Sequence, residues 1–391
     1  MNCLLNSFIL HILKLSLEFN FHQLNIKMKK VKLLVYWSVA SLFFISCDPF
    51  NAIIEEDDDT VVLYEASDIK MAEIDSTLKV VTWNIKFGGG RIDFFFDCHG
   101  DRVLMSAAEV LSNMAEIAAN VRHMNPDILY VQEADIDAKR SAYIDQVQYI
   151  LDHSDLNYAI YASQWKADYV PSDGIGQMNS GNAILSKFPL DNAERVALPL
   201  IGEQSGLVQY FYLRRNILTA DVIVQNTKVA LLNTHTSAYS TDGTKKQQLE
   251  LIEKRIAALE SNGKPFVLGG DFNNLPAGST KFCEFNDDAC LEGSGYETLP
   301  CNVLEEELEN MKIYDAYEAA IPQAKYLLNQ AKYGSFTSDK DGFWNRKLDY
   351  IFTNGSFVEN SGLVHQDLST GGFETMPLSD HAPVSVIYKL N

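Results

Sequence analysis

The hexapeptide GGDFNN, residues 269–274, decides our interpretation of the chain. It follows a short apolar segment, PFVL at residues 265–268, which is typical of a buried strand. Its two glycines permit a tight turn at the strand end. We expect Asp271 and Asn273 to point the same way because strand side chains alternate. A carboxylate can hold a cation or orient a water molecule, and an amide can donate a hydrogen bond to a phosphate oxygen. Taken alone, the hexapeptide is equally consistent with a strand that ends in a polar turn.

Polar residues also end five other apolar strands that the sequence predicts. Each strand is apolar up to its end and then carries an amide, an acid or an imidazole: Asn84, Glu133, His235, Asp349, and Asp380 with His381. Side chains from several strands converge where their ends meet at the edge of a sheet. We therefore expect these groups to form one site.

The length, composition and charge of the chain limit the classes of protein to which it can belong. The 391 residues allow one large domain or two ordinary ones, and the hydrophobic content of 47% is normal for a globular protein. The net charge of −20 and the pI of about 4.8 argue against a broad basic face that grips nucleic acid. They do not exclude a nuclease whose cations lie in a cleft.

The N-terminal region resembles the signal peptide of a bacterial lipoprotein, over residues 28–46. Met28 begins a basic segment, residues 33–45 are apolar but short for a membrane span, and Cys47 follows. We predict that Cys47 is lipidated and that the protein is anchored in the bacterial cell envelope, outside the cytoplasm. An ordinary signal peptide with a chance cysteine is the alternative. Residues 1–27 are interpreted as an upstream over-extension of the reading frame.

We interpret residues 47–77 as an acidic tether between the lipid and the domain, because residues 55–59 are all acidic. Four cysteines remain in the predicted domain: Cys98, Cys283, Cys290 and Cys301. An oxidising compartment favours disulfides between them, but their spacing leaves free buried thiols equally open.

Apolar spacing predicts a helix over residues 106–123 that stops before Pro126, and a second helical segment over 140–152. TKKQ at 244–247 has the form of a capping box that opens a third helix. A strand is expected over 212–224, and Asn354-Gly355 predicts a tight hairpin turn. Strands outnumber helices in both halves. This pattern predicts a four-layer α/β sandwich of two mixed, mostly antiparallel sheets packed face to face, with helices outside.

Six short motifs occur in the order seen in the endonuclease/exonuclease/phosphatase superfamily. They are TWN at 82–84, QE at 132–133, NTH at 233–235, GDFN at 270–273, LDY at 348–350 and SDH at 379–381. The resemblance covers residues 78–391 and includes pancreatic-type deoxyribonuclease, abasic-site endonucleases, bacterial sphingomyelinases and inositol polyphosphate phosphatases. Each motif is weak alone, but six in order are a strong signal. The resemblance implies a four-layer sandwich and Mg²⁺-dependent cleavage of a phosphate ester.

The resemblance also implies roles for single residues. Asn84, Glu133 and Asp380 are the expected metal ligands, since a hard cation prefers oxygen, with Mn²⁺ as a substitute for Mg²⁺. The ion would polarise the phosphoryl oxygen. We expect His381 to act as the general base because imidazole titrates near the working pH.

The remaining catalytic roles surround the phosphate. Asp271 is expected against the attacking water and Asn273 on a phosphate oxygen, while Asp349 orients a histidine and favours its protonated form. His235 would hydrogen-bond the phosphate or protonate the leaving group, although a buried structural histidine is also consistent with its position. Two residues are expected to contact substrate: Asn182, and Arg215, for which a surface cation is the alternative.

Differences between this sequence and the branches of the family restrict the choice of substrate only slightly. Lys86 stands where the abasic-site endonucleases usually have a second asparagine, and His235 favours the nonspecific deoxyribonuclease or sphingomyelinase side. We expect a monomeric phosphodiesterase that acts on nucleic acid or a phospholipid headgroup. The alternatives are a phosphomonoesterase of small phosphorylated molecules, and a catalytically inactive, lipid-anchored binding protein of the same fold.

Overall fold

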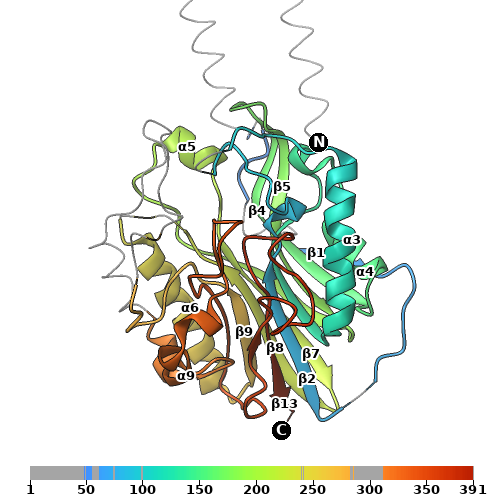
Figure 1. The fold of residues 1–391 in the computed structure, drawn as a ribbon, viewed down its shortest axis with the longest axis vertical. Helices are drawn as coiled ribbons and strands as arrows, with labels where there is room; N and C mark the ends of the chain where they lie inside the picture. Colours follow the sequence, from blue (N-terminus) through green and yellow to red (C-terminus); the bar gives the residue numbers. More distant parts are fainter. Residues whose placement is uncertain are drawn as a thin grey trace, which may run out of the picture. The chain divides into compact units, whose positions relative to one another are not determined.

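The computed structural model describes residues 48, 50–54, 61–73, 75–97, 100–238, 240, 242–281, 285 and 311–390. Two mixed sheets form its centre (Figure 1). The first sheet has the strand order β1 (Val61–Glu65), β4 (Tyr158–Val170), β5 (Gly176–Ser186), β3 (Ile128–Asp135), β2 (Thr77–Asn84), β13 (Val384–Lys389) and β12 (Leu363–Val364). The second has the order β10 (Glu318–Ala319), β11 (Asp349–Thr353), β9 (Phe266–Asp271), β8 (Thr227–His235), β7 (Asn216–Val224) and β6 (Leu190–Ala197).

Helices cover the outer faces of the two sheets. The α-helices are α3 (Ala107–Met124), α4 (Gln146–Asp152), α5 (Gly206–Phe211), α6 (Thr244–Ser261), α8 (Ile313–Ala316) and α9 (Gln323–Leu328), and the short 3₁₀ helices are η1 (Lys86–Gly88), η2 (Lys139–Ser141) and η3 (Gln330–Tyr333). Figure 1 shows α3 and α4 on one side of the sheets and α6 on the other. Among the described strands, β2–β3 and β8–β9 pair in parallel and the other pairs are antiparallel. The predicted fold class is confirmed.

Three apolar cores correspond to the contacts between these layers. The central core joins the inner faces of both sheets, for example Val80 and Tyr130 with Leu231 and Val267. A second core packs the first sheet against α3 and α4, and a third packs the other sheet against α6 and α8. Every strand that leads to the predicted site therefore has at least one buried apolar face.

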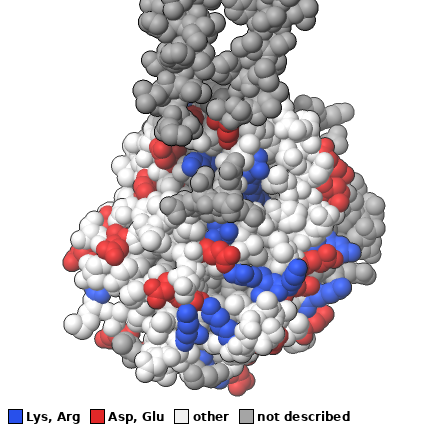
Figure 2. Space-filling model, turned by 180° about the vertical axis from the view of Figure 1, so that it is seen from behind, with Lys and Arg blue, Asp and Glu red and all other residues white. Residues whose placement is uncertain are grey.

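The described surface mixes charges of both signs. Figure 2 shows basic side chains next to acidic ones across the face behind the view of Figure 1. Several are paired, such as Lys187 with Asp127 at 3.0 Å and Lys228 with Asp221 at 2.9 Å. Within the described part of the chain, no helix has both the length and the hydrophobicity to cross a membrane.

The folded domain begins before residue 78, where we had placed its start. Strand β1 pairs with β4 from Val61 to Glu65, and the buried Ala52 packs near the far end of β4. The backbone oxygen of Phe50 also accepts a hydrogen bond from Asp168. Parts of the predicted tether, residues 50–54 and 61–65, thus belong to the domain. Cys47 and the four domain cysteines lie outside the described residues.

The two glycines of the hexapeptide lie within β9 and do not form the predicted turn. A Cβ atom on Gly270 would come within 2.0 Å of the backbone oxygen of Thr234 on β8, and Gly270 has a φ of 144°. A Cβ atom on Gly269 would come within 2.5 Å of the Tyr130 ring from the facing sheet. The glycines are needed because a strand and an aromatic ring approach this backbone closely.

The first helix agrees with the sequence prediction, and the other two differ from it. Ser106 caps α3 through a complete capping box, and Asn125 ends it in a left-handed conformation. By contrast, α4 begins only at Gln146, because Ala142 and Tyr143 have positive φ angles. The predicted capping box of α6 is absent: Gly243 is its N-cap, and Asp242 and Ser240 accept hydrogen bonds from the backbone N–H groups of Thr244 and Lys245 instead.

Two strand predictions were also wrong in part. β7 begins at Asn216, since residues 206–211 form α5, so Arg214 and Arg215 precede the strand. Asn354-Gly355 does not close a hairpin, because the segment after it leaves β11 and supplies β12 to the other sheet. Asn354 instead accepts a hydrogen bond from the backbone of Phe266 at 2.9 Å.

Candidate active site

Three predicted catalytic residues lie in one row across the ends of neighbouring strands. Asp271 at the end of β9 pairs in register with His235 at the end of β8 and with Asp349 at the start of β11. All three side chains are buried. Because β8 and β9 are parallel and β11 is antiparallel to β9, one edge of the second sheet carries all three groups.

Asp271 is the centre of the site. Its Oδ2 lies 3.1 Å from Asn84 Nδ2, 3.3 Å from His235 Nε2 and 3.5 Å from His381 Nε2, while Oδ1 accepts from the Asn273 backbone at 2.9 Å. Burial raises the pKa of Asp271 to about 7, with Asp349 adding to the rise, although His381, Asn273 and Asn84 oppose it.

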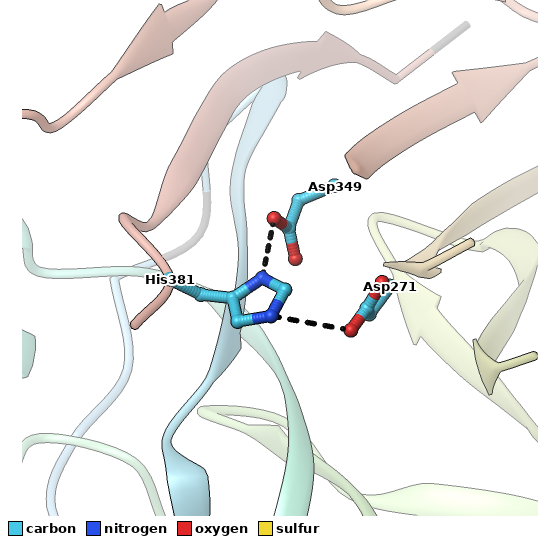
Figure 3. Close-up of side chains that lie close together, drawn as sticks. All are labelled: Asp271, Asp349 and His381. Carbon is cyan, nitrogen blue, oxygen red and sulfur yellow. Dashed lines mark hydrogen bonds and ion pairs between the residues drawn. The ribbon is translucent and has the colours of Figure 1, made fainter. Parts of the chain in front are cut away.

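His381 lies between two carboxylates (Figure 3). Its Nδ1 is 2.8 Å from Asp349 Oδ2 and its Nε2 faces Asp271. Burial alone would lower the pKa of His381, but Asp349 and Asp271 outweigh it and raise the pKa to about 10. A ring that is protonated at neutral pH cannot accept a proton from water. The two carboxylates beside the ring favour its protonated form, and the general-base role of His381 stays a prediction.

Hydrogen bonds from neighbouring residues hold His381 and Asp349 in place. Trp83 donates its indole N–H to the His381 backbone oxygen at 3.0 Å, and Ser379 Oγ donates to the Asn84 backbone oxygen at 2.7 Å. Ser335 Oγ donates to Asp349 Oδ2 at 2.7 Å and accepts from the Asp349 backbone N–H at 3.2 Å. Packing and hydrogen bonds from both sheets therefore fix the orientation of the imidazole.

Glu133 comes from the first sheet at a β-bulge. The register of β3 against β5 shifts between Val131 and Ala134, and Glu133 has a φ of 57°. The bulge directs its side chain toward the second sheet, where Glu133 Oε1 lies 3.2 Å from Asn84 Nδ2 and 4.0 Å from His235 Nε2. The carboxylate is partly exposed, with 31% of the side chain accessible.

The predicted metal ligands fit a hard cation in their chemistry. Glu133 and Asp380 are partly exposed carboxylates that can supply oxygen ligands. Asn84 Oδ1 already accepts from the Lys86 backbone at 3.0 Å, and its N–H groups face Glu133 and Asp271. Asn84 thus orients Glu133, and the metal-binding role of these three residues stays a prediction.

A second group, Asp271, Asp349 and His381, offers ligand atoms within 4.8 Å of one another. These atoms already hydrogen-bond to each other, and an ion between them would displace those contacts. A cation that prefers oxygen also gains less from the imidazole nitrogen. We therefore favour Glu133 and Asp380 for a cation such as Mg²⁺.

The structure brings the remaining predicted residues to the same region. Gln164, on β4, contacts Asn182, Arg215 and His235 through its amide group. Asn273 lies beyond the end of β9 with a φ of 47°, so strand alternation does not set its direction. Its amide donates to the Thr236 backbone oxygen at 3.1 Å.

Comparison with known proteins identifies the family of the chain. Residues 81–381 match the Endonuclease/Exonuclease/phosphatase family. The chain belongs to this family. The family resemblance noted in the sequence is thereby confirmed, and membership supports a phosphoester hydrolase in general.

Solved structures also match the chain at low identity. An endonuclease/exonuclease/phosphatase from Beutenbergia cavernae DSM 12333 is 20% identical, with a TM-score of 0.53, over 81% of this chain and 72% of that chain. A family protein from Bacteroides vulgatus is 14% identical, with a TM-score of 0.48, over 81% and 99%. Truncated TDP2 from Caenorhabditis elegans is 18% identical, with a TM-score of 0.46, over 80% and 97%. No curated protein matches the chain.

Sequence reasoning assigned no role in the site to three buried polar residues that contact it, although it noted Lys86 as a departure from one family branch. Lys86 Nζ lies 3.1 Å from Asp97 and 3.6 Å from Asp380, whose charges outweigh burial and raise the pKa of Lys86. Lys347 Nζ donates to the Asp349 backbone oxygen at 3.0 Å. Gln164 is the third. None of them ends a strand or belongs to one of the six motifs, so the pattern that found the other residues could not find these.

Proposed function

We propose that the protein hydrolyses a phosphodiester of nucleic acid or of a phospholipid headgroup, by metal-assisted in-line attack of water. The observation that carries this proposal is the convergence of Asn84, His235 and His381 on Asp271 Oδ2, at 3.1, 3.3 and 3.5 Å. A buried carboxyl group with a pKa near 7 is suited to accept a proton from water. The two imidazoles beside it can donate to the anionic phosphate oxygens as charge develops, while Asn84 orients the carboxylates.

In this mechanism each side chain has a distinct task. Asp271 accepts the proton of the attacking water. His381, held as a cation by Asp349, donates a hydrogen bond to a phosphoryl oxygen, and His235 donates from Nε2. Asn273 and Arg215 contribute further donors for the phosphate. When bound, the metal ion supplies positive charge that polarises the phosphoryl oxygen and stabilises the leaving oxygen. We propose Mg²⁺, with Mn²⁺ as a substitute, and Glu133 and Asp380 as carboxylate ligands.

Hydrolysis of bis-p-nitrophenyl phosphate tests this function. The purified protein is assayed with Mg²⁺, with Mn²⁺ and with chelator, beside Asp271→Asn and His381→Ala. Asp155→Asn and His153→Ala are matched controls, because both residues are exposed and lie away from the row of catalytic groups. We expect metal-dependent release of nitrophenol that both site variants lose and both controls keep. Equal activity in Asp271→Asn and the parent would refute the role of Asp271.

The same assay separates the alternatives. Release from p-nitrophenyl phosphate but not from the diester would identify a phosphomonoesterase of small molecules. Substrate-class panels of DNA, RNA and phospholipid vesicles follow a positive diester result. Binding without turnover of any ester, by a folded protein, would indicate the inactive binding protein.

We also propose that the protein acts as a monomer held at the cell envelope by a lipid on Cys47. The support is the order of a basic segment, an apolar segment and Cys47 in the sequence. The Cys47→Ser variant should leave the membrane fraction and should not incorporate labelled palmitate. Membrane attachment of that variant would indicate an uncleaved anchor instead.

A further inference from the structure

Gln164 connects three predicted site residues that come from different segments of the chain: Asn182, Arg215 and His235. It is buried within β4, and its Oε1 is 3.0 Å from Arg215 Nη1. Its Nε2 is 2.9 Å from Asn182 Oδ1 and 3.5 Å from His235 Nδ1. One amide group thus contacts a cation, another amide and an imidazole. The orientation of this amide determines which of its partners donates a hydrogen bond and which accepts one.

A series of hydrogen bonds fixes the orientation of the Gln164 amide, with the Ser163 backbone at one end and Arg215 at the other. At one end, the Ser163 backbone oxygen can only accept, and it lies 3.1 Å from Asn216 Nδ2. Asn216 Oδ1 must then accept from Asn182 Nδ2 at 3.2 Å, which leaves Asn182 Oδ1 to accept from Gln164 Nε2. At the other end Arg215 can only donate, so it faces Gln164 Oε1. Both ends require the same orientation of Gln164, and no amide in this series can be flipped without losing a bond.

This orientation leaves one N–H of Gln164 directed at His235 Nδ1. A ring nitrogen that faces a donor must carry its lone pair there, so a neutral His235 holds its proton on Nε2. That nitrogen lies 3.3 Å from Asp271 Oδ2 and 4.0 Å from Glu133 Oε1. We propose that Gln164 is a positioning residue that fixes His235 as the Nε2–H tautomer and aligns it, together with Arg215 and Asn182, on the reacting phosphate.

The charges around His235 make the tautomer decisive. Arg215 and His381 face the ring as cations, and Asp271 and Glu133 face it as acids. The Gln164 N–H that faces Nδ1 requires a lone pair on that nitrogen, so the hydrogen-bond geometry itself implies a neutral ring. A neutral imidazole donates from only one nitrogen. In the Nε2–H form it donates toward Asp271 and the substrate, and in the Nδ1–H form it would present a lone pair to them. The catalytic consequence rests on the proposed function, but the tautomer itself does not.

Nitrogen NMR of the histidine rings in the full chain tests the tautomer directly. Protein with ¹⁵N-labelled histidine is compared with Gln164→Glu, and with His235→Asn to assign the signal. We expect His235 to show a pyrrole-type Nε2 and a pyridine-type Nδ1. In Gln164→Glu a carboxylate faces Nδ1, so these types should exchange. Gln247→Glu, at an exposed position of α6, is the matched control and should leave the signals unchanged. A protonated Nδ1 in the parent protein would overturn the proposal whether or not the variant folds.

Kinetics on bis-p-nitrophenyl phosphate test the positioning role. We expect Gln164→Leu, which removes both donor and acceptor, to lower kcat by about 10- to 100-fold, as loss of an orienting partner typically does. Gln164→Leu activity equal to that of the parent would refute the positioning role. An inactive parent whose His235 shows the expected tautomer would refute the proposed function alone.

Discussion

The Asp349→Asn substitution should lower the pKa of His381 without disturbing the packing around it. Asparagine has nearly the shape of aspartate, but it removes the charge 2.8 Å from Nδ1. A hydrogen bond to a charged group contributes about 1.5–3 kcal/mol, and each pH unit of pKa corresponds to about 1.4 kcal/mol. The pKa of His381 should therefore fall from about 10 by about 1 to 2 pH units. NMR titration of the His381 ring protons measures it.

The same substitution should also change stability in a pH-dependent way. The native ring keeps its proton up to about pH 10, whereas an unfolded histidine loses it near 6.5. The protonated pair therefore stabilises the native state fully below pH 6.5, and the contribution is lost as the pH rises through 10. Asp349→Asn should lower the free energy of unfolding by about 1.5–3 kcal/mol at pH 7 and by much less at pH 10.5.

Urea denaturation of the parent and the variant at both pH values tests this expectation. Asp155→Asn serves as the control, since this carboxylate is half exposed and pairs with Lys70 at the surface. An unchanged pKa of His381 would refute our account of why the ring is protonated. An equal loss of stability at pH 7 and pH 10.5 would show that Asp349 acts through packing or neutral hydrogen bonds instead.

Three further substitutions test other parts of the structure. Gly270→Ala should destabilise the protein by at least about 3 kcal/mol in urea denaturation, because its Cβ would lie 2.0 Å from a backbone oxygen; Gly206→Ala, which meets open space, should change stability by less than about 0.5 kcal/mol. Burial lowers the pKa of Lys347 to about 7, from 10.5 in an unfolded chain. The buried ammonium group therefore lowers the free energy of unfolding most below pH 7. Lys347→Met should raise the melting temperature at pH 6, and the gain should shrink toward pH 10. Glu133→Gln should weaken Mn²⁺ binding by at least about 10-fold in isothermal titration calorimetry, with the melting temperature nearly unchanged.

The fold and the row of catalytic groups could be predicted because both follow from local patterns. His235 and Asp271 end apolar strands and therefore share a sheet edge, and the pairing register places them in one row with Asp349. Asp349 lies at the start of β11, whereas we had expected it at the end of an apolar strand, and it reaches the same edge because β11 runs antiparallel to β9. Helix α3 was predictable because its capping box and the proline after it are written in consecutive residues. In each case the residues that determine the feature lie within about one helix or strand of it in the sequence.

Other features depend on contacts between distant segments, which a local pattern does not contain. The role of Gly270 follows from the approach of β8, and the protonation of His381 follows from two carboxylates that it meets only in the folded state. Gln164 looks like an ordinary polar residue within a strand, and only the folded chain brings Arg215 and His235 to its amide. The hairpin at residues 354–355 failed for the same reason, since the next strand belongs to the other sheet.

The charges of the candidate site bear on the proposed role of a divalent cation. Four acidic groups, Asp271, Asp349, Glu133 and Asp380, lie among basic groups that include His381, Arg215, Lys86 and Lys347. Charges of both signs are therefore mixed around Asp271. In the proposed mechanism, a divalent ion held by Glu133 and Asp380 would add positive charge to this site, where the attacking water must lose its proton. The same ion would therefore favour substrate binding and the ionised form of Asp271 together, which couples the binding of the phosphate to the activation of the water.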